Sequence, residues 1–333
     1  MQFKNDVLFL AGFPRSGTTW FSNLINSHNS IVYRHELIGR NYEAFGEELF
    51  NKIKYDNGLS EDDYQKAINI VRRADIDTDK PPFFKKDFGL SNYPKVHHFS
   101  WLVAKAAPPF RPFYNKLFKF PSKRNDLKLL LKETRSLVDM MSMLKGLRVN
   151  GKIFLIRMPH GSIASHFSGI KQGKMPVVTK SSKLDLFELH GDNPYIQNLN
   201  YSKTEIENLS EAAYFSIQWC IYHIELLNIH KEFPDAILCF YEDFVNNTVE
   251  KTKELMAKLN LEYTSTVESF IQESSGAAKK TNSLLKDSGS DFYSVYRSDS
   301  FKADAWRDKL TEDDIETIDK FTMELYEQLR QQG

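Results

Sequence analysis

A short turn rich in small and polar residues follows the first apolar run of the chain, and this turn constrains the fold most. Val7–Phe13 is continuously apolar, the segment GFPRSGTTW occupies Gly12–Trp20, and apolar and polar residues then alternate at helical spacing over Thr18–Ser27. This order predicts a buried strand, a loop and a helix. Because the first backbone N–H groups of a helix carry partial positive charge, the loop is expected to hold a phosphate.

Three further apolar runs are typical of strands buried on both faces, and a helical pattern follows each of them. The runs cover Leu127–Lys132, Ile153–Ile156 and Ala236–Tyr241, and the helical patterns cover Leu137–Leu144, Ser162–Ile170 and Thr248–Leu259. A long helix over Glu205–Lys231 and an amphipathic one over Thr311–Gln331 are also expected. Repeated strand and helix units predict an α/β fold with a central parallel sheet flanked by helices.

No glycine- or serine-rich linker divides the 333 residues, so one domain over residues 1–333 is predicted. Residues 39–125 combine polar helical stretches with an aromatic, proline-containing piece, which we interpret as a helical insertion that binds a substrate or covers the site. Lys95–Lys128 overlaps it and holds eight Lys or Arg but one acidic residue, Asp126, among many aromatic residues. This segment fits a lid with an aromatic pocket, a surface of snorkelling lysines, or a weak membrane-surface contact.

Charge and cysteine content exclude several classes of protein. Lys plus Arg and Asp plus Glu both number 44, so the net charge gives no support for a nucleic-acid partner. The two cysteines, Cys220 and Cys239, cannot build a disulfide framework and lie in no metal-ligand spacing, which favours a reducing, cytoplasmic setting and no metal site. The apolar run before Pro14 is too short for a signal peptide or a membrane span.

The loop departs from the P-loop pattern GxxxxGKS/T at its lysine. Gly12, Gly17 and Thr19 match, but Thr18 takes the place of the lysine, and the cation stands earlier, at Arg15. A nucleotide kinase needs that lysine on its phosphates, whereas this loop suits a single 5′-phosphate that bears a further charged group. The expected ligands are the N–H groups and hydroxyls of Ser16, Gly17, Thr18, Thr19 and Trp20, with Arg15 at the transferable end. The alternative is a turn that only joins a strand to a helix.

A second candidate anion site lies in the segment Lys152–Ile170. Arg157 ends the predicted strand and Ser165 lies in the helix that follows, so the two side chains can converge. Arginine offers a planar fork to phosphate, and the hydroxyl adds a donor. Together with the loop, this pair offers sites for two separate phosphates of one nucleotide at the carboxyl edge of the sheet. Alone, the segment also fits an arginine in a salt bridge at a strand end.

Several segments resemble the PAPS-dependent sulfotransferases of the carbohydrate and bacterial type, which use 3′-phosphoadenosine 5′-phosphosulfate (PAPS). FPRSGTTWFSNLI resembles their 5′-phosphosulfate loop, and Arg157, Pro159 and Ser165 match their R-x-P-x-x-x-x-x-S pattern, which binds the 3′-phosphate. KETR, ILCFYEDFVNN and AWRDKLTEDDIETI resemble further family segments in the same order. The resemblance implies a P-loop-like fold, PAPS as donor, PAP as product and no metal. The late R-K-G motif of the cytosolic enzymes is missing before Trp306, and Lys302 is its expected substitute.

Sulfuryl transfer needs a base near the acceptor and cations beside the leaving phosphate. Arg15 is the expected cation. Glu36 is the expected base, because IVYRHE reads as a short strand that ends at the same sheet edge as the loop, a layout similar to enzymes of this family that use a glutamate there. The alternative is a surface ion pair of Glu36 with Arg34 or Arg40.

Histidines compete with Glu36 for the role of base. His35 is expected on the opposite face if the strand runs through it. His97 and His98 lie in KVHHF, which resembles the K-x-H strand of the cytosolic enzymes, and histidine has a suitable pKa. The place of that strand in the chain order is already taken by Leu129–Thr134, which favours Glu36.

These observations predict a sulfotransferase that acts on a hydroxyl or amine of a carbohydrate, a lipid or a small natural product. A P-loop-type nucleotide kinase or hydrolase is one alternative, although the missing lysine argues against it. A catalytically inactive module that only binds PAP is another. The acceptor depends on residues 39–125 and on Lys171–Ser202, which we interpret as a loop.

Overall fold

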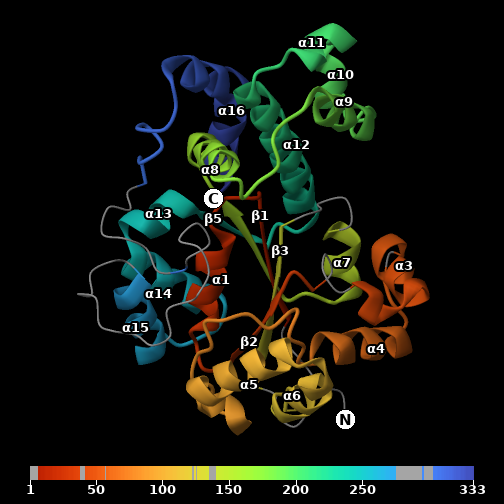
Figure 1. Ribbon diagram of the computed structural model, residues 1–333, viewed down its shortest axis with the longest axis vertical. Coiled ribbons are helices and arrows are strands. Elements are labelled where there is room, and N and C mark those ends of the chain that lie inside the picture. The colour runs from red at the N-terminus through yellow and green to blue at the C-terminus, as the bar shows by residue number, and fades with distance from the viewer. Residues whose placement is uncertain are drawn as a thin grey trace. The chain divides into compact units, whose positions relative to one another are not determined.

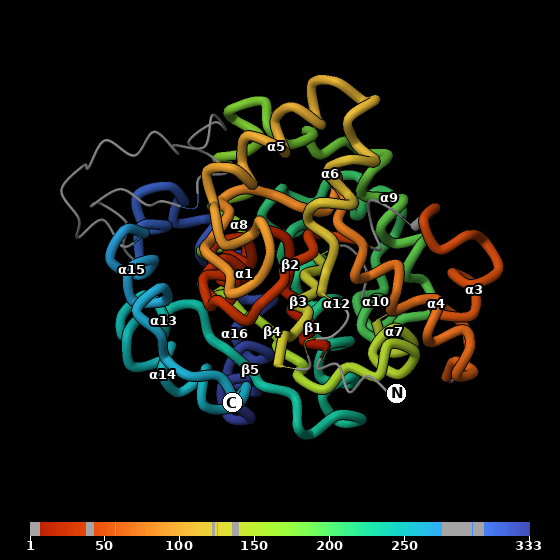
Figure 2. Tube along the Cα trace, turned by 90° about the horizontal axis from the view of Figure 1, so that it is seen from below, coloured from red at the N-terminus to blue at the C-terminus, as the bar shows by residue number. Residues whose placement is uncertain are grey.

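The computed structural model describes residues 7–37, 42–56, 58–121, 124, 126–134, 140–274, 295 and 303–333. Its strands form one five-stranded sheet with the order β2-β3-β1-β4-β5. The strands are β1 (Val7–Gly12), β2 (Ile31–His35), β3 (Lys128–Glu133), β4 (Gly151–Ile156) and β5 (Ile237–Phe240). β1 and β2 lie on either side of β3 and both pair with it in parallel (Figure 2). The predicted α/β fold with a central parallel sheet is confirmed.

The predicted strands are present, with ends that differ by one or two residues. All residues of β1 are buried, and β3 and β4 each bury five of their six residues. Burial on both faces explains why these strands appear in the sequence as unbroken apolar runs rather than alternating patterns. β2 ends at His35, one residue before Glu36.

The described residues fall into two compact units. The first draws on residues 1–12, 17–154 and 246–301, and the second on residues 13–16, 155–245 and 302–333. The peptide bond between Ser16 and Gly17 therefore joins one unit to the other within the Gly12–Trp20 loop.

The first unit contains strands β1 to β3, the described helices between the loop and residue 154, and two helices from residues 246–301. Its helices are α1 (Thr18–Asn26), η1 (Tyr42–Phe45), α3 (Glu47–Tyr55), α4 (Glu61–Val71), η2 (Gly89–Asn92), α5 (Pro94–Ala106), η3 (Pro108–Phe110), α6 (Arg111–Leu117), α7 (Met140–Gly146), α14 (Thr248–Lys258) and α15 (Ser265–Ser274). Between α4 and α6, buried side chains of Trp101, Ala104, Tyr114 and Phe118 pack on Ile76. The helices expected within residues 39–125 are therefore present, and they have a small apolar core of their own.

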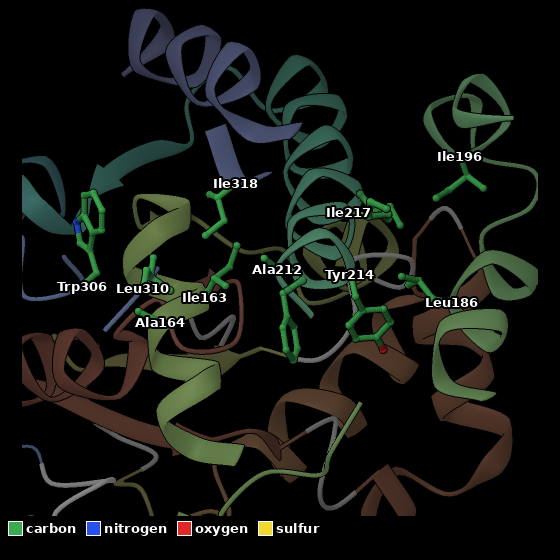
Figure 3. Packing of buried hydrophobic residues seen from close by; sticks show 12 residues of the cluster. Ile163, Ala164, Leu186, Ile196, Ala212, Tyr214, Ile217, Trp306, Leu310 and Ile318 are labelled. Carbon is green, nitrogen blue, oxygen red and sulfur yellow. The ribbon is translucent and has the colours of Figure 1, made fainter. Parts of the chain in front are cut away.

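The second unit holds β5 and a helical layer. Its helices are α8 (Pro159–Lys171), α9 (Lys180–Leu189), α10 (Pro194–Leu199), α11 (Lys203–Glu207), α12 (Glu211–Glu232), α13 (Tyr241–Asn246) and α16 (Glu312–Gln332). Figure 1 shows α12 and α16 side by side, and Figure 3 shows Ile163 of α8 close to Ile318 of α16 within one apolar cluster. This cluster fixes α8, which carries Ser165.

The prediction of one helix over Glu205–Lys231 is wrong. The helix is broken at residues 208–210 into α11 and α12. Ser210 is the N-cap of α12, and its Oγ accepts a hydrogen bond from the N–H of Ala213 at 3.1 Å. The first N–H groups of a helix have no acceptor within the helix, and the side chain of an N-cap serine accepts from one of them. Ser210 therefore starts a new helix.

The interpretation of Lys171–Ser202 as a loop is also wrong, since α9 and α10 lie within it. Thr179 begins α9 with a reciprocal cap to Ser182, and Asn193 caps α10 ahead of Pro194. Each of these helices fully buries one side chain, so neither has the repeated apolar stripe by which amphipathic helices are recognised. The expected helix Thr311–Gln331 is confirmed as α16, with Thr311 as its N-cap. The expected helix Leu137–Leu144 is found as α7, and residues 137–139 lie outside the described residues.

Candidate functional site

The loop between β1 and α1 turns sharply at two residues with left-handed backbone. Arg15 has φ 70° and Gly17 has φ 93°, and the N–H of Ser16 donates to the carbonyl of Phe13 at 2.9 Å. Glycine adopts this conformation without strain, whereas an arginine there costs free energy and is found where the surroundings fix it. Gly17 is the N-cap of α1 and provides no side-chain cap, so the first-turn N–H groups have no acceptor within the helix.

In the second unit, three of the residues singled out in the sequence lie together. The Nε of Arg15 donates to the Oγ of Ser165 at 3.0 Å, and Arg157 donates through NH1 to the carbonyl of Arg15 at 3.0 Å. Arg157 follows the last residue of β4, and Ser165 lies in the second turn of α8. Arg157 and Ser165, which the sequence predicted to converge, therefore each contact the loop at Arg15.

A glycine makes room for the Arg157 guanidinium. A Cβ at Gly161 would lie 2.7 Å from the Nε of Arg157 and 3.2 Å from its Cζ. The other face of the guanidinium lies over the ring of Tyr241, with 4.6 Å from Cζ to the centroid. Its Nε is buried and has no hydrogen-bond partner among the described residues. Arg157 is thus held in a narrow slot while retaining an unused donor.

Glu242 lies beside this arginine. Its Oε1 accepts a hydrogen bond from the N–H of Met158 at 3.1 Å. Burial raises the pKa of Glu242, and the positive charge of Arg157 works against that shift. Glu242 and Gly161 could not be recognised from the sequence, because their roles depend on contacts at the sheet edge rather than on spacing.

His166 supports the loop from the same helix. Its Nε2 lies 3.2 Å from the carbonyl of Pro14, so this nitrogen carries the proton, and its ring stacks on Phe215 at 4.5 Å. Burial lowers the pKa of His166 to about 4, so the ring is neutral near pH 7. Next to it in the chain, Ser165 binds Arg15, so two consecutive residues of α8 fix two consecutive residues of the loop.

In the first unit, the loop continues into α1. Thr18 is buried, and the carbonyl of Thr19 accepts from the Nδ2 of Asn23 at 2.8 Å. The indole of Trp20 is buried and donates to the Oγ of Ser274 at 3.2 Å. The Trp20 side chain therefore anchors α1 to α15, and its backbone N–H is the group that a loop ligand would use.

Glu36 is a buried carboxylate in an ion pair. It is 6% exposed, and its Oε1 accepts from the Nζ of Lys132 at 2.9 Å and from the Oγ1 of Thr134 at 3.0 Å. Lys132, at the end of β3, is itself 2% exposed. The alternative of a surface ion pair with Arg34 is wrong, because Arg34 pairs with Asp79 at 2.8 Å. Arg40 lies outside the described residues.

His35 is expected on the opposite face from Glu36 only if the strand runs through Glu36, and this condition is not met. β2 ends at His35, and Glu36 has φ 48°, so the alternation of a strand does not extend to it. The Nε2 of His35 lies 3.8 Å from the Oε1 of Glu36, and its Nδ1 contacts the Tyr33 hydroxyl at 2.8 Å. The Oγ of Ser22 lies 3.2 Å from the Tyr33 hydroxyl and 3.0 Å from the carbonyl oxygen of Thr19. A chain of polar contacts therefore leads from the start of α1 to Glu36.

His97 and His98 lie in α5, not in a strand. The ring of His97 is stacked between Phe83 and Phe118, with both centroid distances at 4.0 Å, and its Nε2 lies 3.0 Å from the Tyr114 hydroxyl. Burial lowers the pKa of His97 to about 3. This histidine is therefore neutral over the physiological range and packed as a core residue of the α5–α6 region. The ring of His98 meets Phe83 edge-on at 5.9 Å.

Three further features singled out in the sequence are the segment KETR, the expected substitute Lys302 and the segment that contains Trp306. Lys302 lies outside the described residues, as does the last residue of KETR, Arg135. Trp306 stacks on His160 of α8 at 4.4 Å within the second unit. Among the described residues, no three His, Cys, Asp or Glu side chains gather closely enough to bind a metal ion.

Three of the solved structures to which this chain is similar are a sulfotransferase and two sulfotransferase domains. The chain is similar to a mouse sulfotransferase crystallised with PAP, at 15% identity and TM-score 0.46, over 98% of this chain and 88% of that one. It is similar to the sulfotransferase domain of the Synechococcus olefin synthase, at 16% identity and TM-score 0.45, over 96% of each chain. A third is the sulfotransferase domain of the curacin biosynthetic pathway, at 11% identity and TM-score 0.43, over 99% and 98%. No family model and no curated protein sequence matches the chain.

Proposed function

We propose that the protein is a PAPS-dependent sulfotransferase, and the meeting of Arg157 and Ser165 at Arg15 is the observation that carries this proposal. The loop lacks the P-loop lysine and has an arginine instead. Arg15 donates to Ser165 of α8, and its carbonyl accepts from Arg157 at the end of β4. A nucleotide with one phosphate group in the loop and a second phosphate nearby would use all three side chains.

Two unused donors support the fit to such a nucleotide. The Oγ of Ser16 and the Nε of Arg157 are buried and have no hydrogen-bond partner within the described ranges. Buried donors normally have a partner, and a phosphate oxygen is a strong one. In this proposal Ser16, Gly17, Thr18, Thr19 and the Trp20 N–H hold the 5′-phosphosulfate, whereas Arg157 and Ser165 bind the 3′-phosphate.

Glu36 is the base in the proposed reaction. The acceptor hydroxyl or amine loses its proton to the Glu36 carboxylate as its oxygen or nitrogen forms a bond to sulfur, and the bond from sulfur to the phosphate oxygen breaks, releasing PAP. Arg15 balances the charge that develops on the leaving phosphate. Lys132 and Thr134 fix the carboxylate, and both donate to its Oε1.

The acceptor is a small molecule, a glycan or a lipid in this proposal. In the first unit a pocket is lined by Tyr33, Phe83, His97 and Phe118, among other residues of the segments 26–34 and 79–120. Aromatic residues share this lining with the charged Arg34, Asp79, Lys80 and Lys86, so the pocket supports an acceptor that has both a ring-shaped and a polar part. Tyr33 also belongs to the polar chain that leads to Glu36, which supports this side of the first unit as the acceptor side. Cys220 and Cys239 are buried thiols outside any disulfide, which is compatible with the proposed cytoplasmic setting.

Donor binding and sulfuryl transfer test the proposal together. We expect PAP to bind the protein in calorimetry, and Arg157→Met to weaken that binding by about 10- to 100-fold, since a charge-assisted hydrogen bond to phosphate contributes ~1.5–3 kcal/mol. Gly161→Ala should weaken it in the same direction, because the new methyl group displaces the Arg157 side chain. Gly191→Ala is the matched control, since a Cβ there meets its nearest neighbours at 3.4 and 3.5 Å.

Transfer of sulfur-35 from labelled PAPS to a panel of alcohols, glycans and lipids then tests catalysis. PAP binding without transfer to any acceptor would favour an inactive binding module, and Mg²⁺-dependent ATP turnover would favour a kinase or hydrolase. Wild-type protein that fails to bind PAP, or an Arg157→Met variant that binds it unchanged, would overturn the proposal.

A further inference from the structure

Large exposed apolar side chains are concentrated in one segment of the first unit, which contains α5, η3 and the start of α6. Of the ten large apolar residues that are exposed in the described part of the chain, six lie between residues 93 and 113, and each exposes between 44 and 68% of its surface. They are Tyr93, Val96, Phe99, Leu102, Phe110 and Phe113. Figures 1 and 2 both show α5 and α6 side by side, joined by η3. We call the exposed side chains of residues 93–119 the α5–α6 surface.

The opposite side of these helices already forms a core. Trp101, Ala104, Tyr114 and Phe118 are buried in the apolar cluster, and the Nε1 of Trp101 donates to the carbonyl of Ile76 at 3.1 Å. A surface helix that buries one apolar face normally presents a polar face to water. Here the outward face is apolar too, and exposed apolar surface of this kind marks a binding site.

The cations on this surface have no acidic counterparts within it. Between residues 93 and 121 the chain has five basic residues and no Asp or Glu, and the basic residues are Lys95, Lys105, Arg111, Lys116 and Lys119. All five are exposed. The Nζ of Lys105 lies over the ring of Trp101 at 4.6 Å, and Arg111 faces Asp77 at the 4.0 Å limit of an ion pair. The complement of this surface is therefore both apolar and negatively charged.

We propose that the α5–α6 surface docks on the interface of an anionic lipid bilayer. Basic and apolar side chains are interspersed along this surface. A bilayer interface offers acyl chains and anionic headgroups at every point, so it can meet both kinds of side chain wherever they lie. A protein partner would instead need an apolar or acidic group placed opposite each of them. A second copy of the chain would bring five cations against five cations, which opposes self-association. No helix among the described residues is long and apolar enough to cross a membrane.

Vesicle flotation of the full-length protein tests this docking. Wild-type protein should float with phosphatidylcholine vesicles that contain about one third phosphatidylserine, and much less with phosphatidylcholine alone. Phe99→Ser, Phe110→Ser and Phe113→Ser combined should reduce the partition coefficient at least ~10-fold, because apolar burial is lost. Lys95→Gln, Lys105→Gln and Lys116→Gln combined should reduce it on the order of 100-fold at low salt, and little at high salt.

A control variant loses exposed apolar surface elsewhere on the molecule. Tyr55 and Leu189 are 69 and 79% exposed and lie outside the α5–α6 surface, so Tyr55→Ser with Leu189→Ser should leave flotation unchanged. Circular dichroism checks that each variant is folded. The proposal fails if wild-type protein does not bind the anionic vesicles, if the Phe variant binds as well as wild type, or if the same Phe substitutions instead dissociate a dimer in solution. The measurement needs no PAPS, so it is independent of the proposed enzymatic function.

Discussion

Lys132 and Glu36 come from neighbouring strands, and their pairing gives the proposed base its geometry. The register of β2 with β3 sets His35 opposite Lys132, and the N–H of Glu36 donates to the carbonyl of Lys132 at 2.8 Å. A buried ion pair of this kind contributes little net stability, because both charges lose their hydration. In the proposed enzyme, this ion pair holds the Glu36 carboxylate in one orientation.

Replacement of Glu36 by glutamine separates a chemical role from a structural one. The amide oxygen of Glu36→Gln still accepts from Lys132 and Thr134, but the amide cannot take a proton. We expect kcat to fall by about 10²- to 10⁴-fold, the usual contribution of a general base, with an unchanged Kd for PAP. Single-turnover transfer of sulfur-35 and calorimetry measure the two quantities. A fully active Glu36→Gln enzyme would move the role of base to His97 or His98.

At the scale of residues, the sequence indicated the residues of the candidate site but not what surrounds them. Arg15, Arg157 and Ser165 could be expected near one edge of the sheet because the strand ends of a parallel sheet share that edge. The environment of Glu36 could not be predicted, since the contact with Lys132 depends on strand order and on the left-handed backbone of Glu36. The role of Gly161 depends in the same way on the path of the Arg157 side chain.

At the scale of elements, apolar runs predicted the strands well, while helix ends depended on caps. Pattern alone joined α11 to α12, because Ile206 and Leu209 continue the apolar spacing across the break. The side chains of Ser202 and Ser210 decide otherwise, each as an N-cap. The sequence did not predict α9 and α10, because each buries a single side chain, Leu186 or Ile196, and so has no repeated apolar pattern.

Loss of the Ser210 cap should weaken the longest helix of the second unit. Ser210→Ala removes the acceptor for the N–H of Ala213 and should lower the free energy of unfolding by ~1 kcal/mol. Urea unfolding followed by circular dichroism measures the change. Ser181→Ala is the matched control, because Ser181 is an exposed first-turn residue of α9 and not its cap. Equal midpoints for the Ser210→Ala and wild-type proteins would mean that α12 does not depend on this cap.

At the scale of the whole molecule, buried histidines make the fold sensitive to acid. Burial lowers the pKa of His97 and His223 to about 3 and that of His166 to about 4. Their pKa in the unfolded chain is about 6.5. Below that pH the unfolded state binds protons that the native state does not, so stability is lost as pH falls from about 6.5 towards 4. Asp79 and Glu242 oppose this trend, because burial raises their pKa.

One histidine can be removed to measure its share of this acid sensitivity. His97→Phe keeps an aromatic ring between Phe83 and Phe118, and it removes one proton-binding group from the unfolded state. Between pH 6 and pH 4.5, the slope of unfolding free energy against pH should decrease by up to ~1.4 kcal/mol per pH unit. Urea midpoints at several pH values provide the measurement. A variant with the wild-type slope would show that His97 does not remain neutral in the folded protein.

The basic α5–α6 surface also determines how charge is distributed in a molecule with no net charge. The whole chain has 44 basic and 44 acidic residues, and residues 93–121 contain five of the former and none of the latter. The rest of the chain therefore has an excess of five negative charges. Such a protein has an electric dipole moment despite its neutrality, and an anionic surface exerts a torque on it before contact. At low ionic strength the molecule would be oriented before contact, with the aromatic side chains of the α5–α6 surface facing the anionic surface.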